Sequence, residues 1–300
     1  MQFKGFDQMP PSEVISVKVN HQDDVFSVYV WSPEKPIKLH PFLLIHDMGE
    51  DMAAWTYTIK TLVNDGYTVY GFDLRGQGLS KDFSTAVPFK QYWLEVVQIV
   101  SSICERHEGR TPFIMAQGLG ALIALSLNRY NHRFCFALVL ASPLFNLSDQ
   151  LSYYQVLGIK FYARFLSNTN LPKWLSPRFT RNRKIKTGEE VIKIQPRVTG
   201  YIALELFEAI TRSHKMLQRS FNPVLFICPE VSPVHRYDFI QRATVKGQEE
   251  QKVSYVGIQT KYHSIVSDRA EVLDTIRGYI LPWAHRIEKG LPWSIEDKNK

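Results

Sequence analysis

Short apolar runs alternate with segments of helical periodicity along most of the chain. An apolar run without polar interruption is typical of a strand that is buried on both faces, as in a parallel sheet covered by helices. The strand candidates are residues 41–46, 67–72, 112–116, 136–141, 223–228 and 252–257. The helix candidates are residues 53–65, 89–107, 119–130, 200–219 and 268–280. This alternation predicts an α/β fold with a mostly parallel central sheet and helices on both of its faces.

Two segments depart from the alternation. Residues Glu13 to Asn20 and Val25 to Trp31 alternate polar and apolar side chains around a polar turn, which predicts a β-hairpin. Residues 142–218 interrupt the series of strands and helices, and they are rich in aromatic side chains with basic residues between them. Aromatic residues in such an insertion either line a pocket for an apolar ligand or hold the insertion onto the core.

The domain division follows from these patterns. It comprises a core of residues 1–141 and 219–290, an insertion of residues 142–218, and a C-terminal tail of residues 291–300. The helical pattern of the last helix candidate ends at Ile280, and the residues after it become increasingly polar. We therefore expect Trp283 and Trp293 to pin residues 281–300 to the body of the protein.

Composition indicates the cellular compartment in which the protein is expected. No segment reaches about 18 uninterrupted apolar residues, so no membrane-spanning helix is expected. The first ten residues lack the apolar centre of a signal peptide. The cysteines, Cys104, Cys135 and Cys228, are sparse and odd in number, which favours reduced thiols and a cytoplasmic protein. Their spacing indicates no metal site, and no motif in the sequence indicates a cofactor.

The chain is basic, with 36 Lys and Arg against 29 Asp and Glu and a net charge of +7. The densest basic run is residues 178–186, inside the insertion. A solvated surface loop is the simpler interpretation of this run, and contact with anionic lipid headgroups or another polyanion is the alternative. No helix-turn-helix, zinc-finger or RNA-binding motif accompanies it, so no nucleic-acid partner is expected.

Residues 112–125 form the most informative motif, an apolar strand that runs directly into an apolar helix. Such a strand–turn–helix is typical of a nucleophile elbow, which has the sequence Gly-x-Ser-x-Gly with the serine at the apex of the turn. The five positions here are Ala116, Gln117, Gly118, Leu119 and Gly120. The apex residue is therefore Gly118, which has no side chain with which to attack a substrate. We expect a void where the hydroxymethyl group of a serine would lie.

Three further motifs occur in the chain: His46-Asp-Met-Gly-Glu50, Asp73-Leu-Arg-Gly-Gln-Gly-Leu-Ser80 and Tyr262-His-Ser264. Together with the elbow, they resemble the α/β-hydrolase superfamily and, within it, the branch of monoacylglycerol lipases, lysophospholipases and serine aminopeptidases. That branch carries His-Gly-x-Gly-Glu, Asp-x-Arg-Gly-His-Gly-x-Ser and Gly-His-Ser-x-Gly-Gly. The resemblance extends over residues 41–280, and it implies that the insertion is a helical lid over the substrate pocket.

The resemblance also implies the positions of a catalytic triad and an oxyanion hole. They are Gly118 for the nucleophile, Ser232 for the acid, His263 for the base, and the backbone N–H groups of Met48 and Leu119 for the oxyanion. A serine at the acid position has no negative charge with which to stabilise an imidazolium. Glu230, two residues away, is the alternative acid, and it would have to reach the histidine with a defined geometry.

Other positions in the inferred site depart from the same branch. Asp47 replaces a glycine beside the oxyanion hole, where an ionised carboxylate would oppose a developing oxyanion. Gln77 and Gln117 replace histidines. We expect His46, Asp47 and Gln117 to line the pocket. Because these changes are separate in sequence and gather in one inferred site, they favour natural divergence from a catalyst.

The leading hypothesis is a non-catalytic α/β-hydrolase homologue that binds an acyl-type small molecule or a protein partner. The alternative is an enzyme on the same fold. It would be a hydrolase with a displaced Ser232–His263 pair, or a lyase or cofactor-free oxygenase that depends on His263. A third hypothesis is an interaction protein without a ligand, in which the basic insertion contacts a partner. The sequence predicts no oligomeric state.

Overall fold

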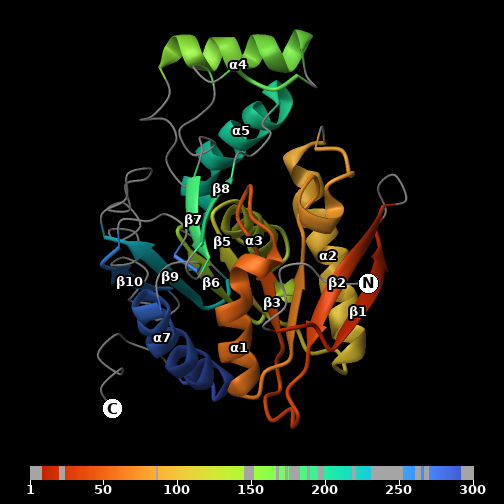
Figure 1. The fold of residues 1–300 in the computed structure, drawn as a ribbon, viewed down its shortest axis with the longest axis vertical. Helices are drawn as coiled ribbons and strands as arrows, with labels where there is room; N and C mark the ends of the chain where they lie inside the picture. The colour runs from red at the N-terminus through yellow and green to blue at the C-terminus, as the bar shows by residue number, and fades with distance from the viewer. Residues whose placement is uncertain are drawn as a thin grey trace.

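The computed structural model describes the chain apart from residues 1–8, 20–23, 86, 145–151, 167–168, 173–174, 176–182, 188–189, 195–198, 218–220, 231–252, 261–264, 267–269 and 292–300. An eight-stranded sheet forms its centre, with the strand order β1-β2-β4-β3-β5-β6-β9-β10 (Figure 1). The strands are β1 Glu13–Lys18, β2 Val25–Trp31, β3 Phe42–Ile45, β4 Val69–Phe72, β5 Phe113–Gln117, β6 Ala137–Ala141, β9 Val224–Pro229 and β10 Val253–Ile258.

The sheet is mostly parallel, as the sequence predicts. The strands from β4 across to β10 pair in parallel, whereas β1 pairs antiparallel with β2, and β2 with β4. Strands β3, β4, β5, β6 and β9 are buried along their whole length. Their continuous apolar sequences follow from this burial on both faces. The α/β-hydrolase fold and the N-terminal hairpin are therefore confirmed.

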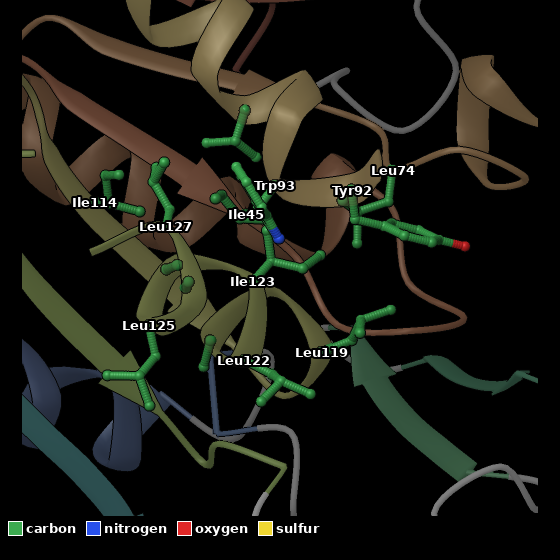
Figure 2. Close-up of a cluster of buried hydrophobic side chains, with 14 of the residues drawn as sticks. Ile45, Leu74, Tyr92, Trp93, Ile114, Leu119, Leu122, Ile123, Leu125 and Leu127 are labelled. Atoms are coloured by element: carbon green, nitrogen blue, oxygen red, sulfur yellow. The ribbon is translucent and has the colours of Figure 1, made fainter. Parts of the chain in front are cut away.

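Helices cover both faces of the sheet (Figure 1). The helices that pack against it are α1 Thr56–Asn64, α2 Phe89–Arg106, α3 Leu119–Tyr130 and α7 Ala270–Glu288. Successive residues of β3 face opposite ways, so Leu43 and Ile45 join the cluster with α2 and α3, and Phe42 and Leu44 join the cluster with α1 and α7. Figure 2 shows part of the first cluster, where side chains of α2 and α3 gather beside Ile45 and Ile114 of the sheet.

The insertion, residues 142–218, contains helix α4 Tyr153–Phe165, strands β7 Arg183–Thr187 and β8 Glu190–Ile194, and helix α5 Gly200–Leu217. Strands β7 and β8 form an antiparallel pair, so the insertion contains two strands that the sequence pattern does not indicate, besides its helices. The basic run of residues 178–186 is likewise not a simple loop, because residues 183–186 belong to β7. Helix α4 lies at one end of the molecule, beyond α5 (Figure 1). The role of the insertion as a lid stays a prediction.

The last helix extends further than the sequence pattern indicates. Helix α7 continues through Pro282 to Glu288, so the expectation that this helix ends at Ile280 was wrong. A proline inside a helix costs about 3 kcal/mol. Trp283 is 1% exposed and packs edge-on against Phe113 of β5, with ring centroids 6.1 Å apart. Burial of this indole and of Ala284 holds the chain helical past the proline. Trp293 lies outside the described residues.

Candidate functional site

Gly118 forms the turn between β5 and α3. Its backbone has φ 54° and ψ −113°, a left-handed conformation that side chains disfavour and glycine adopts freely. Its N–H donates to the carbonyl oxygen of Ala141 at 3.1 Å, and its own carbonyl oxygen accepts from the N–H of Leu122 at 3.2 Å. The strand therefore turns sharply into the helix at this residue, with the geometry that is typical of an elbow.

Gly120 lets the first turn of α3 lie directly against the end of β3. A Cβ at position 120 would come within 2.4 Å of the carbonyl oxygen of Ile45 and within 2.7 Å of that of His46. A larger residue would therefore push the helix away from the strand. This close approach brings the first amides of α3 beside the loop of residues 46–50.

Asp47 in that loop binds the two amides that the sequence assigns to the oxyanion hole. Its Oδ1 atom accepts from the N–H of Met48 at 2.7 Å and from the N–H of Leu119 at 2.7 Å. The aspartate is fully buried. The two amides thus converge on one carboxylate oxygen, as the donors of an oxyanion hole converge on the oxygen of an oxyanion.

The same carboxylate fills the space beside Gly118. A Cβ at position 118 would lie 2.0 Å from both Cγ and Oδ1 of Asp47, and 2.4 Å from its Oδ2. Atoms cannot approach so closely without movement of the aspartate. The expected void at the apex of the turn is therefore absent, because a side chain from another loop occupies it.

His46 holds the backbone of this loop. The N–H of Leu74 donates to its Nε2 atom at 2.9 Å, so that nitrogen is an acceptor and the ring proton lies on Nδ1. Nδ1 then donates to the carbonyl oxygen of Asp47 at 2.7 Å. The imidazole is fully buried, and both of its nitrogens are engaged with backbone groups. We conclude that His46 positions Asp47.

Gln117 joins three segments of the site. Its amide nitrogen donates to both carboxylate oxygens of Glu50, at 3.0 and 3.1 Å. Its amide oxygen accepts from the N–H of Val266 at 3.1 Å. Glu50 in turn accepts from the N–H of Asp47 at 3.4 Å. A glutamine suits this position because it is both donor and acceptor, and it links the β3 loop to the chain just after residues 261–264.

Two further residues of the sequence motifs hold the same loop in place. Asp73 accepts from the N–H groups of Met52 and Leu79, both at 2.9 Å, and from the hydroxyl of Tyr29 at 3.0 Å. Burial, together with this carboxylate, raises the pKa of Tyr29. The amide oxygen of Gln77 accepts from the N–H of Gly49. These contacts explain why the motif of residues 73–80 accompanies the motif of residues 46–50.

Ser142 is a site neighbour that the sequence reasoning missed. It follows β6 and lies next to Ala141, whose carbonyl oxygen binds the Gly118 amide. Its φ is 41°, its side chain is fully buried, and its hydroxyl has no hydrogen-bond partner among the residues that the structure describes. Only the order of the chain, which places residue 142 at the carboxyl end of the strand beside the elbow, could have indicated it.

The predicted acid and base, Ser232 and His263, both lie outside the described residues. Their roles stay predictions. Glu230, the alternative acid, is exposed at the end of β9, and its backbone N–H donates to the carbonyl oxygen of Ile258 at 2.9 Å. The described residues contain no group of His, Cys, Asp or Glu side chains that could hold a metal ion. Cys104, Cys135 and Cys228 are free thiols.

Comparison with known proteins gives the family of the chain and supports its fold. The family model for serine aminopeptidase, S33, a hydrolase family, matches residues 40–270. The chain belongs to this family. A crystal structure of a monoacylglycerol lipase from Paleococcus ferrophilus superimposes with a TM-score of 0.68 at 21% identity, covering 87% of this chain and 98% of the lipase. That likeness is one of fold.

Two curated relatives of the family match parts of the chain. An uncharacterized abhydrolase domain-containing protein of Dictyostelium discoideum is 25% identical over 163 residues, which is 53% of this chain and 16% of the relative. A probable lysophospholipase L2 of Haemophilus influenzae is 29% identical over 113 residues, 35% of each chain. The match thus spans well under two thirds of either relative. Of the helices that the structure describes, none combines the length and the apolar character needed to cross a membrane.

Proposed function

We propose that this chain is a non-catalytic member of the serine aminopeptidase S33 family that uses its site to bind an acyl-type small molecule. The observation that carries the proposal is the position of Asp47. Its Oδ1 atom accepts from the amides of both Met48 and Leu119. A substrate carbonyl would have to displace a buried carboxylate before these two donors could stabilise an oxyanion.

The rate factors that such changes cost in serine hydrolases favour loss of activity here. Removal of the nucleophile from a working triad lowers the rate by a factor of roughly 10⁴–10⁶. Loss of one oxyanion donor costs roughly a further 10²–10³. Gly118 supplies no nucleophile, and both donors are engaged with Asp47. Either change alone would leave little activity, and here the two coincide at one turn of the backbone.

The acyl class of the ligand is proposed from the relatives. A monoacylglycerol lipase shares the fold and a probable lysophospholipase shares part of the sequence. A protein partner at the site is the other form of this proposal, and a small molecule recovered with the purified protein would favour the acyl form.

The test combines an activity assay with a search for bound ligand. We expect the wild-type protein to hydrolyse p-nitrophenyl butyrate no faster than His263→Ala, and native mass spectrometry to show a bound fatty acid or monoacylglycerol. Turnover that disappears in His263→Ala would contradict the non-catalytic role. Labelling of Ser232 by a fluorophosphonate probe would instead support the displaced Ser232–His263 pair. If the protein is inactive and carries no lipid, the acyl ligand alone is wrong.

Variants test separately the missing nucleophile at Gly118 and the Asp47 carboxylate that occupies the two amides. Gly118→Ser by itself places a side chain against the Asp47 carboxylate, so it is expected to give no esterase activity. Gly118→Ser combined with Asp47→Gly restores a hydroxyl and frees both amides. This double variant is expected to show weak activity at best, because Ser232 still stands at the predicted acid position. Full activity in Gly118→Ser alone would mean that Asp47 does not block the site.

A further inference from the structure

Helix α4 has one face that fixes it to the rest of the insertion. Ile159 on this face is 2% exposed. At Gly158 a Cβ would come within 2.7 Å of Leu175, and at Gly200, the start of α5, a Cβ would come within 2.6 Å of Tyr162. These close approaches need the two glycines. The helix therefore packs firmly by one side and does not need its other side for attachment.

The opposite face of α4 is aromatic and open to solvent. The exposed fractions are 76% for Tyr153, 80% for Tyr154, 54% for Leu157, 55% for Phe161 and 69% for Phe165. Four of these residues follow one another at intervals of four, so they form a stripe along the helix. Because successive residues of a helix are about 100° apart, these five side chains cover an arc of about 120° around the axis of α4. A contiguous exposed apolar stripe of this kind, unlike scattered exposed residues, marks an interaction surface.

The charged residues beside this stripe are both basic. Lys160 and Arg164 are exposed and lie beside the stripe, each next to one of its phenylalanines. Helix α4 contains no Asp or Glu. Phenylalanine, leucine and tyrosine combined with lysine and arginine are typical of a helix that lies in the boundary between lipid headgroups and acyl chains. Helix α4 lies at one end of the molecule (Figure 1), and the side chains of this face are exposed to solvent.

We propose that the aromatic face of α4 docks onto a membrane surface that carries anionic lipids. The two cations would contact the headgroups, while Phe161 and Phe165 enter the boundary below them. Charge argues against a second copy of the chain, because a symmetric contact between two α4 helices would place Lys160 and Arg164 against like charges with no acidic residue on either helix. This surface is separate from the Asp47 site, so it goes beyond the proposed ligand binding and stands or falls independently of it.

Co-sedimentation with vesicles tests the proposal. We expect the wild-type protein to sediment with phosphatidylcholine vesicles that contain phosphatidylserine, to bind pure phosphatidylcholine less, and to bind less as salt is raised. Phe161→Ser/Phe165→Ser is expected to lower the partition coefficient by roughly a hundredfold or more, because both phenylalanine side chains lose their burial in the boundary. Lys160→Gln/Arg164→Gln is expected to lower it about fivefold per charge.

A matched control comes from another exposed apolar residue. Leu39 is 56% exposed and lies outside the insertion, so Leu39→Ser should bind vesicles as the wild type does. Circular dichroism checks that each variant is folded. Wild-type protein that stays in the supernatant, or α4 variants that bind as well as the wild type, would overturn the proposal. So would sedimentation velocity showing a wild-type dimer that the phenylalanine variant converts to monomer, because a second copy would then cover α4.

Discussion

The Oδ1 atom of Asp47 lies 2.0 Å from where a Cβ at Gly118 would be. The two positions exclude each other: either residue 118 carries a side chain or the aspartate binds the amides of Met48 and Leu119 in its present position. The glycine and the aspartate are therefore coupled, although 71 positions separate them in the sequence.

This coupling predicts the effect of adding one carbon at the turn. Gly118→Ala is expected to lower the free energy of unfolding by roughly 1–3 kcal/mol from the left-handed backbone alone, and further because Asp47 must move. Gly109→Ala is the control, since Gly109 also has a positive φ, 83°, but has no atom within 4 Å of its Cβ position. Urea denaturation measures both. An equal loss in the two variants would show that Asp47 yields at no cost.

A change at Asp47 separates its charge from its hydrogen bonds. Asp47→Ala leaves the buried amides of Met48 and Leu119 without their acceptor, which is expected to cost about 1–3 kcal/mol for each unpaired group. Asp47→Asn keeps an oxygen for both amides and should cost less. Thermal and urea unfolding of the two variants measure the difference. Similar losses would mean that the charge, and not the pair of hydrogen bonds, stabilises this loop.

Gln117→Glu tests the contact between Gln117 and Glu50. The substitution replaces the donor at 3.0–3.1 Å from Glu50 with a second carboxylate, and like charges at that distance disfavour ionisation of both. We expect the variant to be less stable than the wild type at neutral pH and to recover as the pH falls and one carboxyl takes up a proton. Melting temperatures across the acidic range measure this. Gln117→Leu, which cannot titrate, is the control and should show no recovery.

His107, which lies outside the candidate site, is expected to make the stability of the protein depend on pH. Burial, with smaller contributions from Arg106 and Arg110, lowers the pKa of His107 below its usual value of 6.5. The Tyr70 hydroxyl lies 3.0 Å from its Nε2 atom. Because the unfolded chain takes up this proton more readily than the folded one, stability should fall as the pH drops below about 6.5.

His107→Gln removes the titration while keeping a polar side chain beside Tyr70. The slope of stability against pH just below 6.5 should therefore be shallower in His107→Gln than in the wild type. Chemical denaturation at several pH values measures it. An unchanged slope would assign the acid sensitivity to other groups.

The strands of the fold could be predicted from sequence because of their burial. A strand covered on both faces has apolar residues at every position, so runs such as residues 112–116 mark β5 to within a residue or two. Strands β7 and β8 lack that signal, since lysines interrupt both of them and neither contains a continuous apolar run of strand length. The sequence pattern ends the last helix at Ile280, whereas α7 continues through Pro282 because the burial of Trp283 stabilises the helix beyond it.

The candidate site could be predicted in its backbone and not in its side-chain contacts. The sequence places Gly118 at the apex of a turn and Asp47 near the amides of Met48 and Leu119. The sequence does not show that the Asp47 carboxylate binds the amides of the oxyanion hole. That contact depends on how closely Gly120 lets α3 approach β3. Ser142 was missed for a related reason, since no motif contains it and only the order of the strands in the sheet brings it near.

The hydrogen bonds of Gln117 have a consequence for the synthesis of the protein. They join residues 67 and 149 positions apart, and these long-range contacts cost more loop-closure entropy than local ones. A growing chain cannot make the second one until Val266 has left the ribosome. The elbow and the loop after β3 can come together earlier, but they are tied to the segment that contains Val266 only after that segment has been synthesised.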